Sequence, residues 1–71
     1  MSKEVVAPMP GTIINIMVNV GDEVLEYQEV ITLEAMKMEN AIPSTEAGTV
    51  KEIKVQVNDK VATDQVLIVL E

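Results

Sequence analysis

The sequence contains no cysteine and no histidine, and Tyr27 is its single aromatic residue. Without cysteine, disulfide bonds and thiolate metal sites are excluded. Without histidine, the chain lacks the commonest general base and the commonest metal ligand. Carboxylates could still bind a hard cation, but the spacing of a calcium-binding loop is absent. The residues therefore indicate neither a catalytic centre nor a metal site, and any core must be aliphatic.

Positive charge is also scarce, since 12 acidic residues against 5 basic ones give a net charge of −7. An acidic surface repels phosphate backbones and anionic lipids, which argues against binding to nucleic acids or to membrane surfaces. The same charge favours solubility and could steer the protein toward basic partner surfaces. Long apolar runs and a signal peptide are both missing, so we expect a cytoplasmic protein with no direct membrane insertion.

The most informative feature is an internal repeat within a chain of 71 residues, which is short enough to form one domain, residues 1–71. Residues 11–34 and 48–71 align without a gap at an offset of 37, and eleven of the twenty-four positions are identical. The identical pairs include glycine, aspartate and glutamine, which chance similarity in a valine-rich chain would not normally preserve. We therefore expect one structural motif to occur twice.

Each copy has the pattern of β-strands. Ile, Val and Val occupy alternate positions of residues 16–20 and again of residues 53–57. This period of two predicts that these side chains, Val20 and Val57 included, share a buried face. Ile13 lies three residues before Ile16, and Val50 lies three residues before Ile53. An odd step breaks the period of two, so we expect a bulge or bend there.

Turns and apolar runs complete each copy. Gly21-Asp22 is matched by Asn58-Asp59, and Gly and Asn are the residues that most readily take a left-handed backbone. The apolar runs 30–33 and 66–70 suit strands inside a small sandwich. Two matching halves of about four short strands each predict an all-β fold, a flattened barrel or sandwich with a quasi-twofold axis.

The segment that joins the copies, residues 35–47, breaks the usual turn rules. Strand residues flank it closely, so its hairpin must be tight, and tight hairpins favour Asn-Gly or Asp-Gly because both central residues need positive φ. Here neither Gly, Asn nor Asp occurs until Asn40. A two-residue turn through Met36-Lys37 would hold ordinary residues in a costly conformation. In a chain whose other turns obey the rules, such a violation is where function is expected.

The repeat also predicts where Lys37 lies. The symmetry mate of this central hairpin falls where the chain begins and ends, so Lys37 should project from one end of the domain and both termini from the other. A lysine at a loop tip is usually a solvated charge, and methionines are usually core filler. Two methionines bracketing one lysine are hard to explain as packing, however, because only one of them could easily face inward.

At these residues the sequence resembles the biotinyl domains of biotin-dependent carboxylases and decarboxylases, within the biotin/lipoyl attachment family. Their hallmark is Ala-Met-Lys-Met, present here as Ala35-Met36-Lys37-Met38 and followed by Glu39-Asn40. The flanking pieces resemble the family too, namely Ala7 to Thr12, Val20 to Asp22, and Gly48 to Val50. The resemblance covers essentially the whole chain.

The resemblance implies a biotin carboxyl carrier with two four-stranded antiparallel sheets. Lys37 would form an amide with biotin, installed by a biotin protein ligase, while Ala35, Met36 and Met38 flank it, the methionines fitting the ligase or shaping the biotin environment. The partners would be biotin carboxylase and carboxyltransferase or decarboxylase subunits. The chain departs from the family at Ser44-Thr45, where members often repeat Ala-Pro, and it lacks the protruding insertion of some acetyl-CoA carboxylase carriers.

Two rivals remain. A lipoyl carrier of a 2-oxoacid dehydrogenase complex would share the fold and place a lysine at the same turn, although lipoyl domains more often show Asp before the lysine and Ala or Val after it. An unmodified β-module that serves as a scaffold is a rival of another class. As a biotin carrier, the chain itself would be a non-enzymatic module of an enzyme complex, and biotin on the lysine would carry the chemistry.

Overall fold

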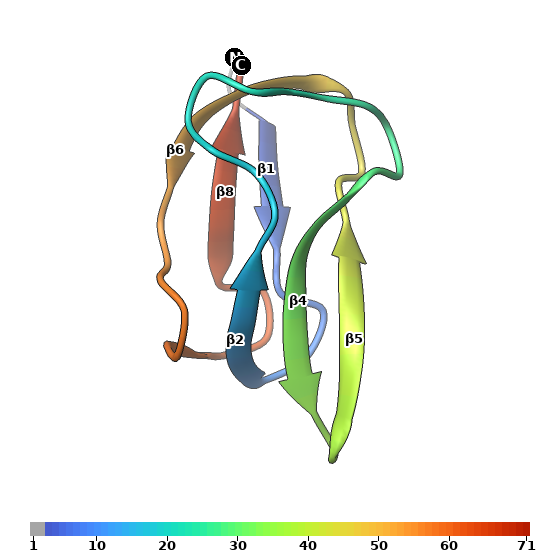
Figure 1. Ribbon diagram of the computed structural model, residues 1–71, viewed down its shortest axis with the longest axis vertical. Helices are drawn as coiled ribbons and strands as arrows, with labels where there is room; N and C mark the ends of the chain where they lie inside the picture. Colours follow the sequence, from blue (N-terminus) through green and yellow to red (C-terminus); the bar gives the residue numbers. More distant parts are fainter. Residues whose placement is uncertain (1–2) are drawn as a thin grey trace.

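The computed structural model describes residues 3–71, which form eight strands joined by turns (Figure 1). All strand pairs are antiparallel. No helix in this part of the chain is long and apolar enough to cross a bilayer. The strands are β1 (Lys3–Val6), β2 (Gly11–Ile16), β3 (Glu23–Val24), β4 (Glu29–Ala35), β5 (Met38–Pro43), β6 (Gly48–Ile53), β7 (Lys60–Val61) and β8 (Val66–Leu70).

Two four-stranded sheets contain these strands, with the orders β1-β8-β6-β3 and β5-β4-β2-β7. Adding 37 to the residue numbers of β2, β3 and β4 gives the positions of β6, β7 and β8. The same offset matches β1 with the second half of β5. It therefore converts one sheet order into the other. Each copy of the repeat gives its two-residue strand, β3 or β7, to the sheet of the other copy. The predicted pair of sheets and the quasi-twofold relation are both confirmed.

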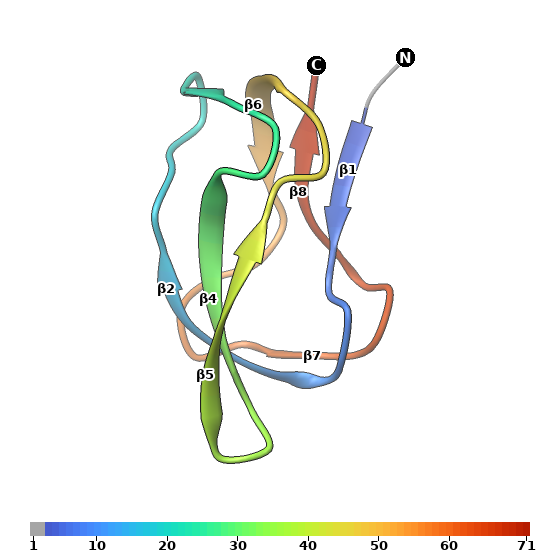
Figure 2. The ribbon, with the colours of Figure 1, turned by 90° about the vertical axis from the view of Figure 1, so that its right-hand side faces the viewer.

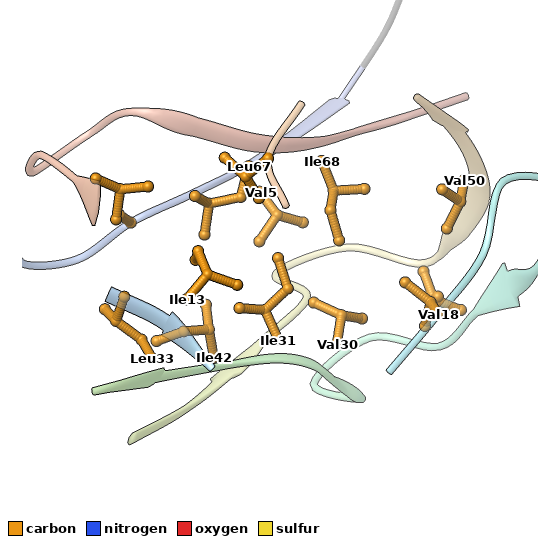
Figure 3. Packing of buried hydrophobic residues seen from close by; sticks show 14 of the residues in the cluster. Val5, Ile13, Val18, Val30, Ile31, Leu33, Ile42, Val50, Leu67 and Ile68 are labelled. Carbon is orange, nitrogen blue, oxygen red and sulfur yellow. The ribbon is translucent and has the colours of Figure 1, made fainter. Parts of the chain in front are cut away.

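The core lies between the two sheets and is wholly aliphatic (Figure 3). Val5, Leu67 and Ile68 on one sheet face Ile31 and its neighbours on the other. Burial of this aliphatic surface is the main force that holds such a small domain together. The largest apolar side chains that are almost fully buried are Ile13, Val24, Val30, Ile31, Leu33, Val50, Leu67, Ile68 and Leu70.

The predicted irregularities occur where the repeat placed them. Register shifts occur between Ile13 and Asn15 in β2 and between Val50 and Glu52 in β6, so the expected bulge is confirmed in both copies. The predicted left-handed turn residues are also confirmed, because Gly21 has a φ of 96° and its counterpart Asn58 a φ of 80°.

One prediction about the core is wrong. Val20 and Val57 do not join the buried face, since 63% and 49% of their surfaces are exposed. The alternation continues beyond the ends of β2 and β6 only as far as Val18 and Val55, which are buried. Beyond them the chain turns, with hydrogen bonds from Asp22 N–H to Asn19 O and from Asp59 N–H to Gln56 O, both at 3.0 Å. Each valine is the second residue of such a turn and therefore points to solvent.

Candidate functional site

The hairpin between β4 and β5 has a two-residue turn made by Met36 and Lys37. Ala35 pairs with Met38, so nothing else lies between the strands. The φ angles of Met36 and Lys37 are 54° and 62°, which confirms the predicted positive-φ turn without glycine. For an ordinary residue the left-handed conformation costs about 1–2 kcal/mol. The rest of the fold must therefore impose this geometry on the tip.

The hairpin is held by pairing below the turn. Strand β4 is a central strand that pairs with β5 along its length, and with β2 as far as Glu34. Ala35, the last residue of β4, keeps only 6% of its surface exposed and anchors the tip against the body of the domain. Asn40 also donates a side-chain hydrogen bond to the Met38 carbonyl (3.3 Å). The turn thus projects from a base of paired strands.

The side chains at the turn point away from the domain. Met36 is 89% exposed and Met38 is 65% exposed, so neither methionine is core filler. Lys37 is also exposed. Within residues 3–71 the ion pair that forms joins Lys54 to Glu52, and Lys37 takes part in none. The Lys37 amine and the two methionine side chains beside it are therefore accessible to a protein that binds the tip of the hairpin.

Acidic side chains lie directly behind the tip. Glu34 of β4 is paired across the hairpin with Glu39 of β5, and both are exposed. Like charges placed opposite each other in a sheet are unfavourable. The Lys37 ammonium offsets part of this charge, so acylation of its amine would leave the tip more negative. Among residues 3–71 no cluster of acidic side chains could hold a metal ion.

Lys37 and the chain termini lie at opposite ends of an elongated molecule, as the repeat predicted. The Cα extents are 32 × 17 × 17 Å, and the hairpin and the termini lie at the two ends of the long axis (Figures 1 and 2). Lys3 pairs with Leu70 at the far end. A chain tethered through either terminus would therefore leave the hairpin free.

With this geometry in place, the chain can be compared with known proteins. The family described as "Biotin-requiring enzyme", which groups biotin and lipoyl attachment domains, matches residues 3–70. The chain belongs to this family. The biotin carboxyl carrier protein of Streptococcus mutans is 61% identical over 49 residues, which are 69% of this chain and 38% of that protein.

Two further comparisons bear on the choice between biotin and lipoate. The dihydrolipoyllysine-residue acetyltransferase component of the Haemophilus influenzae pyruvate dehydrogenase complex is 44% identical over 75 aligned positions, spanning 100% of this chain and 13% of that protein. The crystal structure of Kluyveromyces lactis urea carboxylase superimposes with a TM-score of 0.93 at 27% identity, covering 100% of this chain and 6% of that one. The chain thus matches a small part of much longer relatives.

The structure also explains identities in the repeat that sequence reasoning left without a role. The Asp22 carboxylate accepts a hydrogen bond from the Asn19 N–H (2.9 Å), and Asp59 does the same for Gln56 (2.9 Å). These aspartates close their turns by the side-chain-to-backbone bond that favours Asp in such places. Gly11 is shared with the second copy because a Cβ there would lie 2.5 Å from the Glu34 carbonyl oxygen.

Proposed function

We propose that the chain is a biotin carboxyl carrier in which Lys37 holds biotin through an amide bond. The observation that carries the proposal is the placement of this one amine, exposed at a glycine-free turn with two positive φ angles, at the end of the molecule remote from both termini. Residues 1–71 would act as one carrier domain.

The site fits such a group on chemical grounds. Lys37 supplies a primary amine that a modifying enzyme can reach, and acylation removes its charge. The modified arm could then enter an apolar pocket without burying an ammonium group. When bound, biotin supplies the ureido nitrogen that carries the carboxyl group. Since the chain has no histidine, its own residues place the arm and leave proton transfer to partner proteins.

The rigid base and the long arm have separate tasks. The paired strands β4 and β5 fix where the arm starts, while the lysine stem and the attached group reach outward from it. Tethering raises the effective concentration of the group at two separate active sites without a strong contact at either. Met36 and Met38 provide apolar surface beside the amine, which suits them to fit a ligase or to shape the surroundings of biotin.

Partners and location complete the proposal. A biotin protein ligase would modify the folded hairpin, and biotin carboxylase and carboxyltransferase or decarboxylase subunits would use the product. The similarity to a domain of urea carboxylase supports partners of this general kind. The chain would act in the cytoplasm as a non-catalytic domain or subunit of such a complex.

A lipoyl carrier is the second candidate, because one relative is a lipoyl protein of similar identity and the fold serves both. Biotin is favoured by the methionines on both sides of Lys37 and by the relative that is itself a biotin carboxyl carrier protein.

Co-expression with a biotin ligase, and separately with a lipoate ligase, tests the assignment by intact mass. We expect one biotin per chain, its complete loss in Lys37→Ala, and normal loading in Lys51→Ala. Lipoate in place of biotin would establish the second candidate. No addition by either ligase would overturn both and leave a scaffold role.

A further inference from the structure

The repeat contains two copies of one turn, residues 22–29 and residues 59–66, built on the same backbone. In each copy a glutamine side chain accepts a hydrogen bond from the backbone N–H three residues earlier, at 2.9 and 3.0 Å. In each copy the residue before this glutamine has a φ of 67°. The equivalent valines, Val24 and Val61, are both buried. One turn is therefore an internal control for what the fold requires of the other.

The two turns differ in their exposed side chains. Leu25 and Tyr27 are 71% and 72% exposed, and their counterparts in the second copy are Ala62 and Asp64. Because Ala and Asp complete the same turn, the fold does not require large apolar side chains at these positions. Tyr27 is also poorly suited to its left-handed conformation, which Asp tolerates better. An exposed apolar pair that the fold does not require, one member of which has a strained backbone, is evidence of a role outside folding.

The first turn is also the more acidic. Residues 22–29 contain Asp22, Glu23, Glu26 and Glu29, all exposed, and no basic residue. The equivalent segment, residues 59–66, has two acids and includes Lys60. The apolar pair thus lies in an acidic segment whose charge the second copy does not repeat.

This surface lies away from the Lys37 hairpin. The loop between β3 and β4 is at the end of the molecule that carries the termini (Figures 1 and 2). Its backbone is fixed to the start of the β5–β6 connection by a hydrogen bond from Tyr27 N–H to Ser44 O (2.7 Å). A protein bound here would leave the Lys37 hairpin uncovered.

We infer that residues 22–29 form a docking surface for a partner protein with an apolar patch rimmed by lysine or arginine. Apolar contact through Leu25 and Tyr27 would supply affinity, and the acidic rim would supply orientation and association rate. A second copy of this chain does not fit, because the two acidic rims would repel. The inference goes beyond the carrier role and holds whichever group Lys37 bears.

A leucine–lysine amphipathic peptide serves as the probe, with the intact chain followed by NMR amide shifts. We expect shifts at residues 22–29 and none of comparable size at residues 59–66. The double variant Leu25→Ala/Tyr27→Asp installs the side chains of the second copy, so it should fold normally. It should weaken binding at least about tenfold, which is the effect of losing about 1.4 kcal/mol. Glu23→Gln/Glu26→Gln should weaken binding and reduce its dependence on salt.

The reciprocal variant, Ala62→Leu/Asp64→Tyr, is the matched control, and it should gain shifts at the second turn. Equal shifts at both turns of the unaltered chain, or unchanged affinity in Leu25→Ala/Tyr27→Asp, would overturn the inference. The amide spectrum outside the turn reports whether each variant is folded. Intact mass reports Lys37 modification in the same samples, so a failed docking surface is distinguishable from a failed carrier assignment.

Discussion

Replacing Lys37 by glycine should stabilise the domain while destroying its modification site. The Lys37 φ of 62° costs an ordinary residue about 1–2 kcal/mol, and glycine escapes that cost. Glycine also makes the unfolded chain more flexible, which lowers the free energy of unfolding by about 0.5–1 kcal/mol. The expected net gain is about 0.5–1 kcal/mol for Lys37→Gly, and about twice that for Met36→Asn/Lys37→Gly, which installs the favoured Asn-Gly turn.

For a domain of this size, each 1 kcal/mol changes the melting temperature by about 4–8 °C. Far-ultraviolet circular dichroism is the suitable assay, because the chain has no tryptophan and a single tyrosine. Lys37→Ala is the control that separates the effect of backbone strain from the effect of losing the amine. It removes the amine but keeps a Cβ, so its stability should stay within about 0.5 kcal/mol of the unaltered chain. If Lys37→Gly proves no more stable than Lys37→Ala, the turn is not strained and the reasoning fails.

Four further substitutions test the fold by the same denaturation assay. Gly11→Ala should cost about 2–3 kcal/mol, because its Cβ would meet the Glu34 carbonyl at 2.5 Å, and a loss below 1 kcal/mol would contradict that close approach. Gly21→Ala should cost only about 1 kcal/mol, since its φ of 96° is strained for alanine but nothing lies within 4 Å. Tyr27→Gly should stabilise by about 0.5–1 kcal/mol through relief of a φ of 67°, and a loss would show that the ring supports the fold. Ser44→Ala should change stability by less than about 1 kcal/mol, because the buried hydroxyl donates to the Glu46 carbonyl and accepts from the Glu46 N–H, and water can replace it at this exposed residue.

Much of the fold was predictable because the same pattern of residue types occurs in both copies of the repeat. The bulge after Ile13 followed from an apolar step of three, and the turn at Gly21 from its exchange with Asn58. The turn at Met36-Lys37 was predictable because the two predicted strands leave room only for a tight turn, and no glycine lies between them. These features depend on local backbone chemistry, which residue types report directly.

Other features depend on tertiary context. Val20 matches the strand period but is the second residue of a turn that Asp22 stabilises, and this turn directs it to solvent. The two-residue strands β3 and β7 are too short to show any period, so their exchange between sheets is visible only in the structure. The left-handed backbone of Tyr27 was equally hidden, because nothing in the residue type favours a positive φ.

The most direct test of the carrier assignment is peptide mapping by mass spectrometry of the protein isolated from its native cells. The account predicts biotin in amide linkage on the peptide that contains Lys37 and on no other lysine. Biotin on a different lysine, or a bare or lipoylated Lys37 in cells whose other biotin proteins are loaded, would contradict it.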